Sequence, residues 1–355
     1  MGQQMSEQAP GTAYEVQGFG PLDEALFSAD LLEGVRVDHP IGALTTYRVG
    51  GAAARFIRPV DVSELERAAR AVAKAGAAPG REHGMGVIPV LVLGRGSNLL
   101  VSDDGFAGLA VQLGSGFDEV VVDLEAGGGT VRVGGGASLP VVARRTVAEG
   151  LAGMEWAVGV PGSIGGAVRM NAGGHGSDMS TVLVSASTVD LTTGACRTRA
   201  VDELSLGYRR SSVAGNEVVV SVELGLPIGD RAAGEARLAE VVRWRRANQP
   251  GGQNAGSVFT NPSDDSAGRL IDTAGGRGLR MGTAEVSKRH ANFIQVDEGG
   301  ADITGGMTVA GGLTMTGYAH VNTGNLGINK ESPEYKVDVQ ATSTVETTEF
   351  SAQGG

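Results

Sequence analysis

The sequence predicts an α+β protein in which strands outnumber helices. Short apolar runs, such as residues 87–94, lie between turn-forming residues, as is typical of buried strands. Glycine supplies 58 of the 355 residues, clustered between these runs without the Gly-X-Y period of collagen. Helical patterns are fewer, and most are bounded by a capping residue or a glycine.

The first elements follow a polar N-terminal extension, which we place at residues 1–38 and expect to be loose. A strand-like pattern begins near residue 44. We expect the next helix to be capped by Asp61 or Ser63 and to end at Gly76. Its apolar stripe consists of Leu65, Ala68, Ala69 and Val72.

The remaining elements continue this mixture. Strand patterns fit residues 108–113, 119–123, 130–134, 181–191, 217–226 and 290–296. Helical patterns fit residues 139–150, where Gly150 ends the helix, and 233–247, with a short helix at 266–275.

The composition changes near residue 300. All 25 arginines lie at or before Arg289, and residues 301–355 are rich in threonine and glycine and repeat short segments. This pattern predicts a repetitive β tail whose origin differs from that of the preceding chain.

Charge and cysteine content exclude several classes of protein. A net charge of −11 argues against a general nucleic-acid binder. Cys196 is the single cysteine, so no internal disulfide forms, and the histidines show no metal-ligand spacing, so we predict no metal. The chain shows no spanning apolar run and no secretion signal, so we expect a cytoplasmic protein that binds no membrane.

Two glycine turns are candidates for anion binding. In LGRGSNLLVSDDGF (93–106), Gly94 and Gly96 let backbone N–H groups approach an anion, and Ser97 and Asn98 add donors. The turn in 133–145 leads into a helix whose first N–H groups suit a phosphate. Either segment could instead be an ordinary turn.

The stretch 156–176, WAVGVPGSIGGAVRMNAGGHG, is rich in glycine and small apolar residues. Because few side chains intervene, it can lie flat against a planar ligand, and Asn171 could contact the ring atoms of that ligand. The alternative is a buried glycine-rich crossover. We interpret His175 as a turn residue.

Two further segments carry candidate catalytic groups. Tyr208 and Arg209 follow an apolar approach, and arginine can bind a carboxylate or stabilise an enolate. Ser257 lies in a glycine turn and could donate a proton to a strongly basic carbanion. The cationic patch before it, suited to a diphosphate, consists of Arg243, Arg245 and Arg246. Taken alone, these could be surface and turn residues.

In this order, the motifs resemble the UDP-N-acetylenolpyruvoylglucosamine reductase family over roughly residues 40–300. The resemblance is carried by TTYRVGG, LGRGSNLLVSDDGF, GMEWAVGVPGSIGGAVRMNAG, GYRRS, NAGSVFTNP, AGRLIDTAGGRG and VSKRHANFI. It implies a two-lobed FAD-binding fold of the vanillyl-alcohol-oxidase type with a smaller α+β substrate domain. By resemblance, the two lobes span 39–114 and 115–227, and the substrate domain spans 228–300.

The resemblance also implies an activity. Through FAD, NADPH reduces UDP-N-acetylglucosamine enolpyruvate to UDP-N-acetylmuramate in peptidoglycan precursor synthesis. Arg209 matches the catalytic arginine and Ser257 the proton donor. The implied substrate-binding residues are Tyr208, Arg209, Asn254 and Ser257. The implied cofactor-binding residues are Tyr47, Gly94, Arg95, Gly96, Ser97, Asn98, Gly136, Pro161, Gly162, Ser163, Gly166, Asn171 and Gly173.

The resemblance stops before the family's C-terminal catalytic glutamate. Glu331 and Glu334 lie near the expected distance in a different context. Three interpretations follow: an impaired reductase, a functional reductase in which a tail acid or no acid suffices, or a truncated flavoprotein fused to a trimerising stalk. The chain is then a monomer if residues 301–355 are inert and a homotrimer if they associate. A flavoprotein oxidase acting on another alcohol fits the motifs around Arg209 and Ser257 less well.

Overall fold

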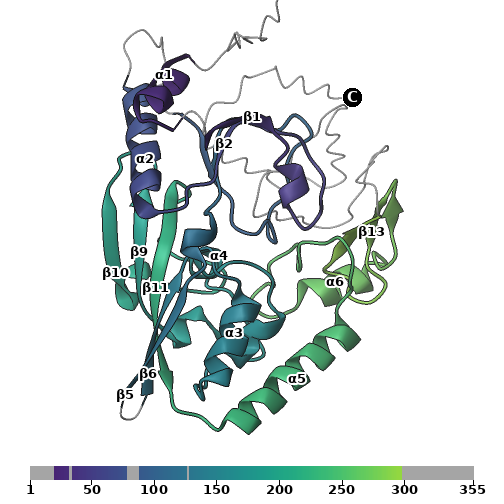
Figure 1. Cartoon of the computed structure of the whole chain (residues 1–355). Helices are drawn as coiled ribbons and strands as arrows, with labels where there is room; N and C mark the ends of the chain where they lie inside the picture. The colour runs from purple at the N-terminus through teal and green to yellow at the C-terminus, as the bar shows by residue number, and fades with distance from the viewer. Residues whose placement is uncertain (1–19, 32–33, 78–87, 126–127, 298–355) are drawn as a thin grey trace, which may run out of the picture.

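The computed structural model describes residues 20–31, 34–77, 88–125 and 128–297. Figure 1 shows a small N-terminal sheet with two helices, a larger sheet beside and below it, and a C-terminal segment along the lower right edge. The expected tail at 301–355, including Glu331 and Glu334, lies outside the described residues.

The first lobe contains a four-stranded sheet and two helices. The helices are α1 (Gly20–Ser28) and α2 (Val62–Gly76). The strands are β1 (Arg36–His39), β2 (Ala53–Ile57), β3 (Val90–Val92) and β4 (Phe106–Val111), in the order β1-β2-β4-β3. Strands β2 and β3 both pair with β4 in parallel, so the carboxyl ends of these three strands share one edge of the sheet.

The predicted bounds of helix α2 and its predicted apolar stripe are confirmed. Asp61 caps it by accepting a hydrogen bond from the Glu64 N–H, and Leu65, Ala68, Ala69 and Val72 are buried. The expectation that residues 1–38 are loose is wrong for residues 20–28, because α1 buries Leu22 and Leu26 in the core beside α2. The strand expected near residue 44 begins only at Ala53.

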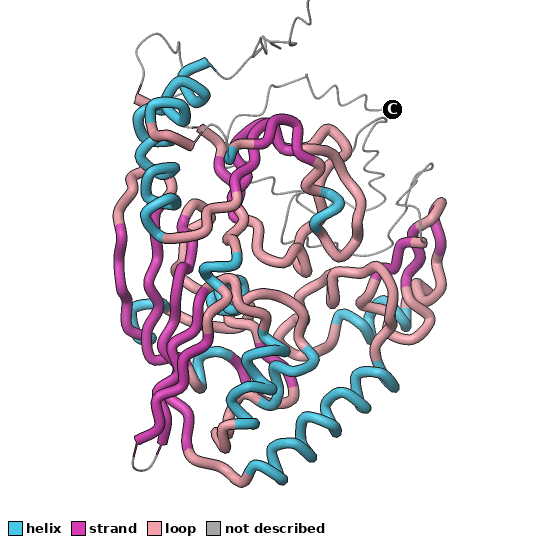
Figure 2. Tube along the Cα trace, viewed as in Figure 1, coloured by secondary structure: helices cyan, strands magenta, loops and turns pink. Residues whose placement is uncertain are grey.

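The second lobe is an antiparallel sheet with two helices. Its strands are β5 (Val120–Glu125), β6 (Gly128–Gly134), β9 (Leu183–Asp190), β10 (Cys196–Ala200) and β11 (Glu217–Pro227), in the order β10-β9-β11-β6-β5. Helix α3 (Leu139–Ala148) was predicted, whereas α4 (Ile164–Met170) and the short hairpin β7 (Gly173–Gly174) and β8 (Ser177–Asp178) were not. Figure 2 shows the long strands as one layer and α3 and α4 to one side of it.

The two lobes share part of their apolar core. Side chains of α1 and α2 pack in one cluster with Val189, Leu191, Val218 and Val220 of the larger sheet or its adjoining turn. At the edge of this contact, the Cys196 thiol donates a hydrogen bond to Glu66 of α2. We therefore regard the two lobes as one packing unit.

The C-terminal segment, residues 228–297, consists of two helices and a small sheet of short strands. Helix α5 (Arg231–Asn248) contacts α3, and it leads to α6 (Ala267–Thr273) and a small antiparallel sheet of β12 (Arg280–Met281), β13 (Ala284–Val286) and β14 (Ile294–Val296). Figure 1 places this sheet at the right, below the first lobe. Among the described residues, no helix is long and apolar enough to cross a membrane.

Candidate functional site

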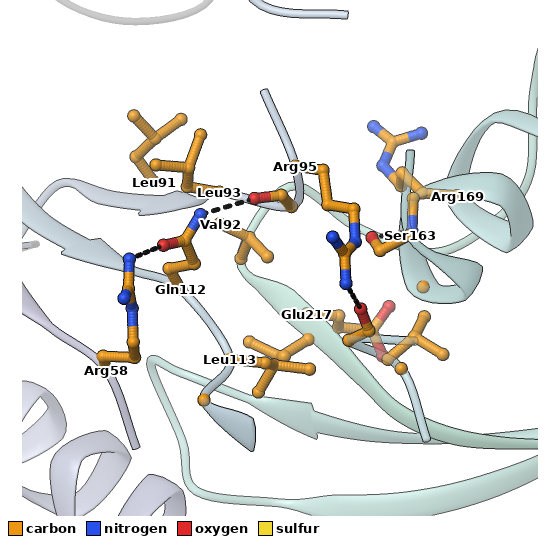
Figure 3. A pocket seen from close by; sticks show the side chains of 18 of the residues that line it. Arg58, Leu91, Val92, Leu93, Arg95, Gln112, Leu113, Ser163, Arg169 and Glu217 are labelled. Carbon is orange, nitrogen blue, oxygen red and sulfur yellow. Dashed lines mark hydrogen bonds between the residues drawn. The ribbon is translucent and has the colours of Figure 1, made fainter. Parts of the chain in front are cut away.

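A cavity of about 530 Å³ lies between the first two lobes. Its walls come from the carboxyl ends of β3 and β4, the turn after β6, helix α4 and the segment leading into β11 (Figure 3). Of the residues predicted to bind the cofactor, five line it: Gly94, Arg95, Gly136, Ser163 and Gly166. A concave site of this size at strand ends is typical of cofactor pockets.

The glycine loop after β3 presents free backbone donors. Gln112 Nε2 donates to the Gly94 carbonyl at 2.7 Å, and the Thr46 N–H donates to the Gly96 carbonyl at 3.0 Å. In a trans peptide the C=O and the following N–H point in opposite directions, so the N–H groups of Arg95 and Ser97 face away from these partners. Within the described residues, neither N–H donates a hydrogen bond.

Gly96 explains why this loop needs glycine. Its φ of +65° lies in the left-handed region, and an added Cβ would lie 2.3 Å from the Leu44 carbonyl oxygen. A side chain would therefore displace the loop from the first lobe.

Cationic groups around the cavity exceed free carboxylates. The Arg95 guanidinium is 3.4 Å from the Gly136 carbonyl and 3.7 Å from Asp118. Glu217 is already held by Arg199, with both carboxylate oxygens at 2.9 Å. The Arg169 side chain makes no hydrogen bond or ion pair with any described residue. The cavity therefore suits an anionic ligand.

Arg58 stands behind the glycine loop. Its guanidinium donates to Gln112 Oε1, which leaves the Gln112 amide nitrogen to hold Gly94 (Figure 3). The motifs did not reveal Gln112, Arg58 or Arg169. Arg58 and Gln112 meet because β2 and β4 end side by side in the first lobe, and the pairing of the lobes adds Arg169 from α4.

The other predicted cofactor residues are not among those that line the cavity. The Ser97 hydroxyl donates to the Pro161 carbonyl at 3.2 Å, and Gly162 packs beside it, whereas Asn98 is exposed. Asn171 is buried, and its amide nitrogen donates to Asp178 and to the Gly207 carbonyl. Its oxygen accepts from the Ser180 N–H, so this amide joins three protein segments. Gly173 lies in β7.

Tyr208 and Arg209 lie in an exposed turn between β10 and β11 of the second lobe. Arg209 has a φ of +56°, and its guanidinium contacts the Gly173 carbonyl at 3.4 Å and lies over the Tyr208 ring at 5.8 Å. Arg209 thereby reaches back to the glycine-rich segment predicted to line the ligand.

Ser257 is exposed in a glycine turn of the C-terminal segment. Gly256 before it has a φ of +79°, and Asn254 Oδ1 accepts a hydrogen bond from the Gly256 N–H. Ser257 forms a bridge with Phe293, and no hydrogen bond joins it to Arg209 among the described residues.

Of the three arginines in the predicted cationic patch, two are exposed and one is half-buried. Arg243 and Arg246 are exposed, whereas Arg245 packs against Gly159, where an added Cβ would lie 2.0 Å from Arg245 Cδ. Burial lowers the pKa of Arg245, and the side chain has no ion pair within the described chain. Burial and the nearby Arg245 charge also lower the pKa of His175, whose ring meets Trp244 edge-on.

Tyr47 lies away from the cavity. It is 6% exposed and packs with Ala284 and Val296 of the C-terminal sheet. The structure therefore places this predicted cofactor residue at the contact between the first lobe and the C-terminal segment.

Two protein-family models match the chain. An FAD-binding domain matches residues 53–198, and the C-terminal domain of UDP-N-acetylenolpyruvoylglucosamine reductase matches residues 248–309. Together the matches include the cavity's glycine loop, helix α4 and the Ser257 turn.

Individual proteins similar to this chain belong to the same family as the C-terminal match. A UDP-N-acetylenolpyruvoylglucosamine reductase of Symbiobacterium thermophilum is 41% identical over 262 residues, covering 73% of this chain and 80% of the relative. One from Paramagnetospirillum magneticum is 41% identical over 258 residues, covering 72% and 78%. The crystal structure of the Thermus caldophilus reductase superposes with a TM-score of 0.61 at 35% identity, covering 74% of this chain and 88% of that one.

Proposed function

The chain belongs to the UDP-N-acetylenolpyruvoylglucosamine reductase family, and we propose that FAD occupies the cavity between its lobes while Arg209 and Ser257 act on the substrate. As a member of this family, it is an FAD-dependent oxidoreductase that uses NADPH. Its reaction is the reduction of the enolpyruvyl group of a UDP-sugar in peptidoglycan synthesis.

The residues around the cavity fit FAD. The free N–H groups of Arg95 and Ser97, with the Arg169 guanidinium, suit a diphosphate, because anions bind to oriented backbone donors and arginine. When bound, FAD supplies the hydride carrier between NADPH and the substrate. This loop geometry is the observation that carries the cofactor proposal.

The substrate roles follow from charge and proton balance. Hydride addition to the enolpyruvyl carbon–carbon double bond leaves negative charge delocalised into the adjacent carboxylate. Arg209 stabilises that charge with its guanidinium, and Ser257 donates a proton to the carbon that becomes carbanionic. The half-buried Arg245 adds a fixed positive charge near Gly159, suited to a substrate phosphate.

The boundaries at 39–114, 115–227 and 228–300 serve as our proposed division into two FAD lobes and a substrate domain. The alternative, an impaired FAD-binding relative fused to a trimerising stalk, receives no support from the relatives. The cytoplasmic location and the oligomeric state stay predictions.

NADPH oxidation by the purified protein, with and without UDP-N-acetylglucosamine enolpyruvate, tests the function after the flavin spectrum is recorded. We expect bound FAD and substrate-dependent turnover. A yellow protein without such turnover would contradict the catalytic roles while leaving the cofactor proposal intact. A colourless protein that binds no added FAD would contradict the assignment of the cavity.

A further inference from the structure

We propose that Tyr47 is a positioning residue for Ser257, holding the Ser257 turn against the first lobe. The inference rests on the proposed role of Ser257 as proton donor. It assigns Tyr47 to the protonation step, whereas its motif predicts a cofactor contact.

The packing of Tyr47 points away from the cofactor cavity. Its neighbours in a small apolar cluster are Ala284 and Val296, which face each other across β13 and β14. Ala255, two residues before Ser257, packs against the same cluster. Tyr47 therefore touches both the C-terminal sheet and the turn that carries Ser257, and it is not among the residues that line the cavity.

The Ser257 turn needs such an anchor. Gly252 and Gly256 both have positive φ values, and an added Cβ at Gly256 would meet nothing within 4 Å. Glycine at these two positions gives the backbone conformational freedom that contacts with neighbouring segments must restrict. After the serine, the chain is fixed by Asn292, which bonds the N–H groups of Val258 and Phe259.

Before the serine, β14 holds the turn within the C-terminal segment: the Val296 N–H donates to the Gln253 carbonyl at 3.0 Å, and the Gln295 side-chain amide donates to the Gly251 carbonyl at 2.9 Å. Tyr47 supplies the contact between this turn and the first lobe. The Asn254 side chain bonds the carbonyls of Gly251 and Gly252 and the N–H of Gly256, all within the turn itself. Burial raises the pKa of Tyr47, and a hydrogen bond with the Ala255 backbone opposes that rise. The tyrosine ring and hydroxyl thus connect Ala255 to the lobe that forms the cavity.

The consequence is a separation between the two halves of the reaction. Delivery of a hydride by NADPH needs no proton from Ser257, whereas reduction of the enolpyruvyl group does. Loosening the turn should therefore slow the second half-reaction more than the first, since small misplacements of a catalytic group are costly.

The experiment compares Tyr47→Ala, Tyr47→Phe and Ile41→Ala in the holoenzyme. Ile41 is a buried first-lobe residue in a separate cluster, so its truncation controls for general loosening of that lobe. For Tyr47→Ala, we expect the enolpyruvyl half-reaction to slow by about tenfold or more. The rate of the NADPH half-reaction and the FAD Kd should stay within about twofold of the wild-type values, and the same is expected for Ile41→Ala.

Two further readouts separate positioning from other roles. Amide hydrogen exchange of residues 253–258 should accelerate in Tyr47→Ala and stay unchanged in Ile41→Ala. Tyr47→Phe keeps the ring and should recover most of the rate. If Tyr47→Ala does not fold, Tyr47→Leu, which removes the ring but keeps an apolar side chain, takes its place and should slow the enolpyruvyl half-reaction in the same way.

A raised FAD Kd with unchanged exchange at 253–258 would overturn the inference and return Tyr47 to cofactor binding. Equal slowing of both half-reactions, or no slowing, would also overturn it. A wild-type protein that binds FAD and reacts with NADPH but not with the enolpyruvyl substrate would refute the proposed function itself.

Discussion

The second lobe and the C-terminal segment bury very different amounts of apolar surface. The lobe has an extended core that includes Val131, Leu139, Met154, Ile164 and Leu224. Between residues 228 and 297, the buried hydrophobic side chains are Val241, Ala267, Ala284, Ala291, Phe293 and Val296, of which several are alanines. Apolar burial is the main stabilising contribution to folding, so the C-terminal segment should be the weaker part.

Ion pairs compensate only partly in the C-terminal segment. Pairs such as Arg231–Glu235, Arg237–Glu240 and Arg277–Asp272 are largely exposed to solvent. An exposed pair contributes about 0–1 kcal/mol. The proposed cofactor site therefore lies against the extended apolar cores of the two lobes, whereas Ser257 lies in the segment that we expect to open first.

The largest expected effect tests whether the two regions divide the chemistry. Ser257→Ala should slow enolpyruvyl reduction by about 10²–10⁴-fold, because general acid catalysis contributes about this much. The FAD spectrum and the NADPH half-reaction should persist. Ser263→Ala, at an exposed serine in the same segment, is the matched control. Loss of FAD in Ser257→Ala would contradict the division.

Cavities in the two regions should have different consequences. Leu224→Ala opens the second lobe's core and should lower the free energy of unfolding by about 2–5 kcal/mol, with loss of FAD. Phe293→Ala should disorder the C-terminal segment, abolish turnover and leave FAD bound. Denaturant unfolding followed by flavin absorbance distinguishes these outcomes, and simultaneous loss of FAD in both variants would show that the regions unfold together.

Limited proteolysis should cut residues 228–297 before it cuts the lobes. The reason is the small apolar core of that segment, which makes local opening easier. Mass spectrometry of the early fragments locates the cleavages. Equal resistance of both regions would show that contacts such as α5 with α3 stabilise the segment more than its own core suggests.

A smaller effect, on the FAD Kd, is expected for substitutions of Gln112 in the first lobe. Gln112→Leu removes the hydrogen bond to Gly94, and the FAD Kd should rise by about two- to tenfold. Gln112→Glu keeps a partner for Arg58 but loses the donor, so it should weaken binding similarly. Titration with ADP should show the same change, whereas adenosine, which lacks phosphates, should bind as to the wild type.

Acid should produce the smallest effect, confined to the C-terminal segment. The Arg269 guanidinium lowers the pKa of Asp265 from 3.8 to about 2, and Arg277 also lowers the pKa of Asp272. A depressed carboxyl pKa stabilises the fold fully above pH 3.8, and this stabilisation is lost as the pH falls through about 2. Trp244 fluorescence in a Trp156→Phe background follows the segment, and Asp265→Asn should remove part of the dependence.

Sequence patterns predicted the elements whose signals are local. Helix α2 combines an Asp61 cap with an apolar stripe, and helices α3 and α5 were similarly recognisable. Helix α4 was missed because Gly165 and Gly166 disfavour a helix, although Ser163 caps it and Ile164 anchors it in the core. The glycine loop after β3 was predicted because only glycine allows the backbone to come as close to a neighbouring segment as Gly96 does to Leu44.

Contacts between distant segments could not be predicted in this way. Gln112 gains its role only because strand β4 ends beside β3. Tyr47 lies in a recognised motif, yet its burial depends on a sheet more than 200 residues later in the chain. The family resemblance suggested the roles proposed for Arg209 and Ser257, whereas the contact between Tyr47 and Ala255 was found only in the structure.

The thiol at the contact between the lobes offers a built-in reporter. Cys196 is the single cysteine of the chain, it is exposed, and it joins β10 of the second lobe to Glu66 on α2 of the first. A fluorophore or spin label attached there needs no engineered background. Its signal would record whether the two lobes shift relative to each other when the cavity between them fills.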